Sequence, residues 1–287
     1  SPNIHASMAT WLVARGNKQE ADAMIERKEY LQRLYDWKDE QVIKVVTGIR
    51  RCGKSTLLKQ YQEKLMQSGI LPEQIISINF EDLEYEELLD YKALYRYIKE
   101  RLCEGKMTYI FLDEIQKVDS FEKAVDSIYI KDMTDIYITG SNAYMLSGDL
   151  ATLLTGRYVE ISMLPFSFRD YYALTAPELS PDAAFADYMR YGGFPYLSTM
   201  KKTPEKAAVY LEGIYNTVII KDIEDRQNRR ENDPSKRKIT DIALLKTIAR
   251  YMASVVGSPV SVKSVTDYLT SNGRKISPNT VSDYMEA

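Results

Sequence analysis

The sequence predicts an α/β fold with a mainly parallel, doubly wound sheet. Short apolar segments rich in β-branched residues alternate with amphipathic helical patterns between residues 42 and 161. A glycine-bounded loop joins the first of these strands to the first helix, and a pair of acids directly follows a later strand. Both features lie where open α/β sheets bind their ligands, at the carboxyl ends of parallel strands.

The alternation predicts each element in turn. Val42, Ile43, Val45 and Val46 are apolar and β-branched, as expected of a strand buried on both faces. In residues 91–102, tyrosines and leucines recur at helical spacing; this is typical of packing against a sheet, with base stacking as the alternative. Strands are predicted at residues 42–46, 74–80, 109–113, 135–139 and 157–161, and helices at 56–66, 91–102 and 121–129.

The loop after the first strand fits the phosphate-binding pattern GxxxxGK[ST]. The glycines allow backbone angles that a Cβ would obstruct, so successive N–H groups can turn toward phosphate oxygens. Lys54 can reach the β- and γ-phosphates of a nucleotide, and the Ser55 hydroxyl can bind Mg²⁺. The residues expected to surround the phosphates are Gly48, Ile49, Arg50, Arg51, Cys52, Gly53, Lys54, Ser55 and Thr56.

Two acids, Asp113 and Glu114, follow the apolar strand that begins at Tyr109. Since the phosphate loop belongs to the same edge of a parallel sheet, we expect Asp113 to hold Mg²⁺, through water. Glu114 is then the residue expected to orient and deprotonate an attacking water. The alternative interpretation is an acidic turn after an ordinary strand.

Two further polar residues are candidates for contact with the γ-phosphate. Ser141 and Asn142 follow the strand at 135–139, and Asn142 is the favoured ligand for the attacking water or the γ-phosphate. A capping or turn role is the alternative for Asn142. Arg157 could stabilise charge on the γ-phosphoryl group, within one chain or across a subunit boundary. An ion pair with an acid such as Glu160 is the alternative for Arg157.

The composition is that of a globular protein and argues against several other classes of protein. The chain has 287 residues, 45% hydrophobic and 28% charged, which is ordinary for globular domains. Its net charge of -3 gives no overall basic field for nucleic acid. Cys52 and Cys103 lack disulfide or metal spacing, which suits a reducing cytoplasm. The sequence contains no run of 18 or more apolar residues, so no membrane-spanning helix is expected. The one histidine, His5, falls in residues 1–23, interpreted as an N-terminal extension or an added remnant, so histidine catalysis is not expected.

After Pro165 the pattern becomes helical throughout. Helices at 166–172, 182–191 and 204–222 predict a lid, with a tight turn at residues 192–195 and a polar linker at 224–238. Three further helices, at 240–252, 261–269 and 277–285, predict a helix-turn-helix or winged-helix-like unit that binds DNA or a protein partner. No wing hairpin follows, so this unit is expected to be truncated. The predicted segments are 1–23, a core at 24–162, a lid and linker at 163–235 and the last unit at 236–287.

The motifs together resemble a prokaryotic family of AAA-type ATPases, relatives of the archaeal and signal-transducing P-loop ATPases. Many members carry a C-terminal domain of unknown function, which looks absent from this chain. The resemblance implies an ATPase core with an additional strand, a helical lid and a winged-helix-like unit. The motifs that carry it are GIRRCGKS at 48–55, FLDEIQ at 111–116, TGSN at 139–142, TGRY at 155–158, LPFSF at 164–168 and GGFP at 192–195.

The leading expectation is a cytoplasmic ATPase that uses ATP and Mg²⁺, with nucleotide state coupled to movement of the lid and C-terminal unit. A homo-oligomer is one expected arrangement. Two alternatives stay open: a nucleotide-operated switch with negligible turnover, and a DNA-binding regulator. GTP has no support, because the sequence contains no NKxD base-reading motif.

Overall fold

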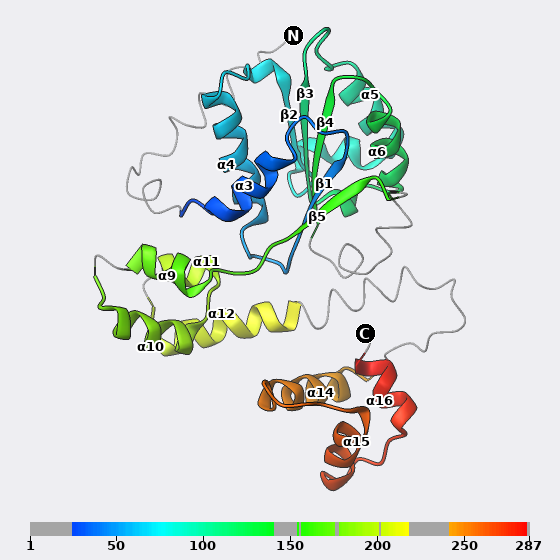
Figure 1. Ribbon diagram of the computed structural model, residues 1–287. Helices are drawn as coiled ribbons and strands as arrows, with labels where there is room; N and C mark the ends of the chain where they lie inside the picture. The colour runs from blue at the N-terminus through cyan, green and yellow to red at the C-terminus, as the bar shows by residue number, and fades with distance from the viewer. Residues whose placement is uncertain are drawn as a thin grey trace. The chain divides into compact units, whose positions relative to one another are not determined.

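A computed structural model of the chain describes residues 25–140, 154, 156–175, 178–200, 202–217 and 241–285 (Figure 1). The chain divides into two compact units, each described below by itself. The first comprises residues 1–141 with 148–207, and the second comprises residues 142–147 with 208–287. The first unit contains the sheet, and the second contains the last three helices.

A five-stranded, fully parallel sheet forms the centre of the first unit, as the sequence predicts. Its strand order is β2-β3-β4-β1-β5. Every residue of β1 and β3 is buried, which explains why these strands are mainly apolar rather than alternating. The strands are β1 (Ile43–Thr47), β2 (Ile75–Asn79), β3 (Thr108–Asp113), β4 (Thr134–Gly140) and β5 (Tyr158–Ser162).

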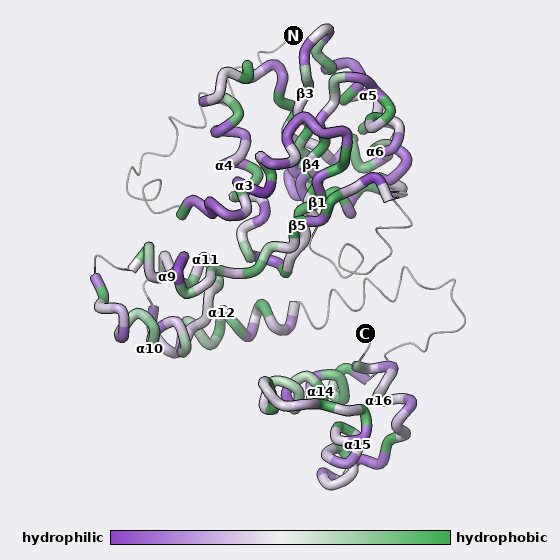
Figure 2. Tube along the Cα trace, in the orientation of Figure 1, coloured by the Kyte–Doolittle hydropathy of each residue, from purple (hydrophilic) through white to green (hydrophobic). Residues whose placement is uncertain are grey.

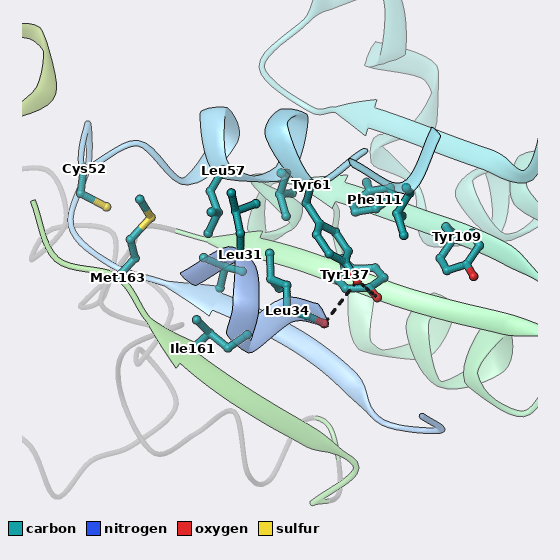
Figure 3. Packing of buried hydrophobic residues seen from close by; sticks show 13 residues of the cluster. Leu31, Leu34, Cys52, Leu57, Tyr61, Tyr109, Phe111, Tyr137, Ile161 and Met163 are labelled. Atoms are coloured by element: carbon teal, nitrogen blue, oxygen red, sulfur yellow. Dashed lines mark hydrogen bonds between the residues drawn. The ribbon is translucent and has the colours of Figure 1, made fainter. Parts of the chain in front are cut away.

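Helices cover both faces of the sheet (Figure 1). On one face lie α3 (Lys28–Asp36) and α4 (Lys54–Gln67), and on the other lie α5 (Tyr91–Lys99) and α6 (Phe121–Tyr129). Figure 3 shows Tyr61 of α4 packed against Phe111 and Tyr137 of the sheet. Short 3-10 helices span Pro72–Gln74, Leu83–Leu89 and Ile115–Lys117.

The elements after the sheet are helical, as predicted. They are α9 (Phe168–Thr175), α10 (Pro181–Tyr191), α11 (Pro195–Thr199) and α12 (Pro204–Asn216). The sequence predicts only a turn at residues 192–195, yet Pro195 begins the short helix α11, because its fixed φ and missing N–H suit a first helical position. A cluster joins α9 to α10: the Tyr171 hydroxyl donates to Asp187 at 2.5 Å, and the Lys202 ammonium lies 2.6 Å from the same carboxylate.

Within the second unit, three helices share a core of their own: α14 (Ile242–Ser254), α15 (Val262–Ser271) and α16 (Pro278–Met285). Hydrophobic and hydrophilic positions alternate along these helices (Figure 2). The side chains of Asp241, Ser261 and Ser277 each accept a hydrogen bond from a first-turn N–H of the helix that follows. The predicted three helices are therefore present, and residues 241–285 contain no strand that would make a wing. None of the described helices is long and apolar enough to cross a membrane.

A buried polar network lies at the amino ends of β1 and β4. Lys44 of β1 and Asp135 of β4 form an ion pair at 2.5 Å, and neither side chain is exposed. The Asp39 N–H and the Tyr137 hydroxyl each donate to the other Asp135 oxygen at 2.9 Å. Burial lowers the pKa of Lys44 and raises the pKa of Asp135, while the attraction between the two charges opposes both shifts. The pair therefore joins the two strands only as long as both partners are present.

We predict that Asp135→Asn destabilises the protein by about 3–5 kcal/mol, because the Lys44 ammonium is left buried beside a neutral amide. The double variant Lys44→Met, Asp135→Asn should lose less of the free energy of unfolding, because it buries no unpaired charge. It also keeps an acceptor for the Asp39 N–H and the Tyr137 hydroxyl. Urea unfolding of both variants measures the difference. Equal losses in the two variants would contradict the ion-pair account.

Candidate functional site

The parallel sheet gathers the predicted site at one edge. The loop of residues 48–53 leaves the carboxyl end of β1, and Asp113 ends β3. β4 lies between these two strands and ends beside both. The strand order therefore places the phosphate-binding loop and the acid pair close together, although more than 55 residues separate them in the chain.

The loop has the backbone conformation that its glycines were predicted to permit. Gly48 has a φ of 148°, and a Cβ there would lie 2.3 Å from the carbonyl oxygen of Met163. Gly53 has a φ of 104° and directly precedes α4. The first turn of α4 contains no acidic residue and has no side-chain cap, so its N–H groups are suited to bind an anion at this helix end.

Lys54 lies inside this loop. Its ammonium donates to the carbonyl oxygens of Gly48 at 3.0 Å and Ile49 at 3.3 Å. It also lies 3.9 Å from a carboxylate oxygen of Glu114. Both side chains are buried, so the pair brings opposite charges to the place where a phosphate would meet the acids.

Asp113 and Ser55 are the residues predicted to bind Mg²⁺. Burial raises the pKa of Asp113, opposed by hydrogen bonds from the Thr139 and Ser55 hydroxyls. The neighbouring charge of Glu114 raises this pKa further, and that of Lys54 lowers it. A hydroxyl and a carboxylate are the hard oxygen ligands that Mg²⁺ prefers, so this donor set fits the ion. No group of three or more His, Cys, Asp or Glu residues gathers within the described ranges, so a Mg²⁺ ion here would complete its ligands with phosphate and water.

Glu114 is held in an uncommon backbone conformation. Its φ of 56° lies in the left-handed region, which is unfavourable for a residue with a Cβ. Its N–H donates to the Thr139 hydroxyl at 2.9 Å, and one carboxylate oxygen accepts from the Gln116 amide at 2.5 Å. Main chain and side chain are therefore both fixed by neighbouring residues.

Arg157 lies away from these residues. It precedes the amino end of β5, and its carbonyl accepts from the N–H of Ile43 at the start of β1. The length of β1, about 15 Å, therefore separates it from the loop. Its guanidinium lies 3.9 Å from Asp126 and over the ring of Tyr129. Glu160, the acid suggested as its partner, instead accepts from the Thr47 hydroxyl at 2.6 Å.

Cys52 lies within the described residues, whereas Asn142 does not. Cys52 is fully buried in the loop, and burial raises the pKa of its thiol, opposed by the charges of Lys54 and Arg27. Ser141 and Asn142 lie outside the described residues, so the role of Asn142 stays a prediction.

Three residues at or beside the site carry no role in the sequence analysis. Thr139 bonds to both acids, and only the pairing of β4 with β3 reveals this. Gln116 belongs to the quoted motif FLDEIQ, which hints at a role without stating one. Arg27 is buried, donates to the Leu164 carbonyl at 3.1 Å and lies over the ring of Phe166. No periodic pattern marks Arg27, since it comes just before α3 begins.

Comparisons with known proteins agree with this geometry. Residues 40–172 match a family model described as "AAA domain", and residues 182–287 match one described as a domain of unknown function (DUF8612). An uncharacterised protein of Haemophilus influenzae is 38% identical over 268 residues, covering 92% of this chain and 64% of that protein. An uncharacterised protein of Methanocaldococcus jannaschii is 28% identical over 259 residues, covering 85% of this chain and 54% of that protein.

A solved structure shares the fold. The Walker-type ATPase of Pyrococcus abyssi superposes with a TM-score of 0.57 at 18% identity, covering 95% of this chain and 91% of the other. The chain spans just under two thirds and about half of the lengths of the two curated relatives. The match at 182–287 covers most of the predicted lid and linker together with the predicted C-terminal unit. The chain therefore carries an AAA domain at residues 40–172, followed by a domain of unknown function at residues 182–287, and shares its fold with a Walker-type ATPase.

Proposed function

We propose that this chain is a Mg²⁺-dependent ATPase that couples nucleotide state to movement of its later helices. The observation that carries the proposal is the meeting of three groups at one sheet edge. Lys54 lies within the loop, Asp113 has the Ser55 hydroxyl among its neighbours, and Glu114 lies 3.9 Å from Lys54. In this proposal residues 24–162 are the core, 163–235 the lid and linker, and 236–287 the C-terminal unit.

Each residue has a separate task in the proposed reaction. The loop N–H groups and Lys54 bind the phosphates, and Ser55 and Asp113 hold Mg²⁺. The bound ion supplies neutralisation of charge on the β- and γ-phosphates. Glu114 accepts the proton of the attacking water, and Asn142 is proposed to contact that water or the γ-phosphate. Catalysis then rests mainly on positioning and charge, as expected of phosphoryl transfer.

A nucleotide-operated switch is the second candidate, and one observation favours it. The Glu114 carboxylate accepts from Gln116 and faces Lys54, so the proposed base is engaged by two neighbours. A base held in this way would turn over slowly until Lys54 shifts toward phosphate. Tight nucleotide binding that changes protease sensitivity, with negligible phosphate release, would favour the switch. A DNA-binding role has less support, because α16, the expected recognition helix, contains no Lys or Arg.

The first test separates binding from hydrolysis. Lys54→Ala should lose ATP binding, whereas Glu114→Gln should keep binding and lose about 10²–10⁴-fold in turnover, because only the proton acceptor is removed. Phosphate release and fluorescent ATP-analogue binding measure the two effects. Glu63→Gln makes the same chemical change at an exposed position of α4 and should behave as wild type. If the wild type, Lys54→Ala and Glu114→Gln hydrolyse ATP equally slowly, the enzyme proposal fails.

The loop conformation gives a second prediction. Gly48→Ala should abolish ATP binding, since its Cβ would lie 2.3 Å from the Met163 carbonyl oxygen and the φ of 148° disfavours any side chain. Gly213→Ala in α12 is the matched control, because its Cβ meets no atom within 4 Å. That variant should bind ATP normally and melt at the same or a slightly higher temperature. ATP binding by Gly48→Ala at wild-type affinity would contradict the proposed cradle.

The position of Arg157 gives a third prediction. Because about 15 Å of strand separates it from the loop in one chain, any contact with a γ-phosphate must reach a second subunit. Specific ATPase activity should then rise with protein concentration, and Arg157→Ala should remove only that rise. Activity per molecule that is constant with concentration, and equal in both proteins, would assign Arg157 to its contacts with Asp126 and Tyr129.

A further inference from the structure

The Thr139 hydroxyl forms hydrogen bonds with both acids of the site. It is the penultimate residue of β4 and is fully buried. Its Oγ1 donates to a carboxylate oxygen of Asp113 at 2.5 Å and accepts from the N–H of Glu114 at 2.9 Å. These directions are the only ones available if Asp113 is ionised, because a carboxylate only accepts and an amide N–H only donates. Both hydrogen-bonding functions of the hydroxyl are thus used.

The two bonds act on different properties of the acids. The bond to Asp113 fixes the carboxylate, whose other neighbours include the Ser55 hydroxyl. The bond from Glu114 fixes its main chain, which has the left-handed φ of 56°. The Glu114 carbonyl also accepts from the Lys117 N–H at 3.1 Å, so both ends of this residue are held. Without the hydroxyl, the main chain of Glu114 can relax from its left-handed conformation, and its side chain then points in a different direction.

We propose that Thr139 is a positioning residue for ATP hydrolysis: its single hydroxyl fixes the metal-binding acid Asp113 relative to the base Glu114. The proposal rests on the proposed function, since it gives these acids the same roles. Thr139 contacts neither nucleotide nor water in this scheme and acts through the acids. The competing explanation is a buried threonine that only stabilises the sheet, and it predicts a change in stability alone.

Three variants separate the two explanations. Thr139→Val keeps the shape of the side chain and removes the hydroxyl, whereas Thr139→Ser keeps the hydroxyl. Thr108→Val is the matched control: Thr108 is buried at the start of β3, and its hydroxyl accepts from the Cys103 N–H at 2.9 Å. It therefore loses a comparable bond at the opposite edge of the sheet.

We expect Thr139→Val to lower kcat by about 10²-fold with a smaller change in KM, because misplacement of the base acts on the chemical step. Thr139→Ser should restore kcat to within several-fold of wild type, and Thr108→Val should keep it. Thr139→Val should melt at a lower temperature than Thr108→Val, because it loses two hydrogen bonds, one of them to a carboxylate, where Thr108→Val loses one. The proposal is wrong if Thr139→Val lowers kcat no more than Thr108→Val does. It is also wrong if a folded Thr139→Ser is as inactive as Thr139→Val.

A second measurement does not depend on turnover. We expect Thr139→Val to need more Mg²⁺ than wild type to reach half of its Mg²⁺-dependent gain in affinity for a fluorescent ATP analogue. Thr108→Val and Thr139→Ser should follow the wild-type titration. If the wild type hydrolyses no ATP, the proposed function fails, yet this titration still decides the role of Thr139. Identical Mg²⁺ titrations for Thr139→Val and Thr108→Val would then overturn it. If Thr139→Val does not fold, Thr139→Ala takes its place.

Discussion

All five strands run in the same direction, and the site depends on this alignment. Parallel strands bring their carboxyl ends to one edge, so a loop after β1, two acids after β3 and a hydroxyl near the end of β4 become neighbours. Such a sheet must be covered on both faces, which α3 and α4 do on one side and α5 and α6 on the other. The same strands are joined at the opposite edge by the buried pair of Lys44 and Asp135. Contacts at both ends of the strands therefore stabilise the strand pairing on which the site depends.

Burial determines the electrostatics at the functional edge. Asp113 and Glu114 are adjacent acids with little exposure, and burial is the largest influence on the pKa of Asp113. In such surroundings each attraction is screened less than in water, so Lys54 and the hydroxyls of Thr139 and Ser55 oppose the effect of burial on the pKa of Asp113. This arrangement also favours a cation beside the acids, since a bound ion would reduce the repulsion between them. A cation beside the acids would therefore both reduce their repulsion in the folded protein and serve the proposed chemistry.

The sequence predicts individual elements well and relations between strands poorly. The helix predicted at 121–129 is α6, and the phosphate loop lies directly between β1 and α4, because local periodicity and glycine positions determine both. The bonds of Thr139 and the Lys44–Asp135 pair are absent from that prediction, because each depends on which strands become neighbours. Lys44 interrupts an apolar run, and the hydrophobic pattern of the sequence gives no reason for a lysine at this position. Arg157 follows a simpler rule: residues that precede a parallel strand gather at the edge away from the site.

The contacts around the loop indicate how nucleotide binding could reach the later helices of the first unit. The Met163 N–H donates to the Thr47 carbonyl at 2.8 Å, and its own carbonyl leaves no room for a Cβ on Gly48. Figure 3 shows Met163 beside Cys52 of the loop. Three residues later, the Phe166 N–H donates to the Gly193 carbonyl at 2.7 Å, directly before α11. These contacts connect the loop to residues 163–166 and, through them, to the turn between α10 and α11, which is the path that the proposed coupling to the later helices would use.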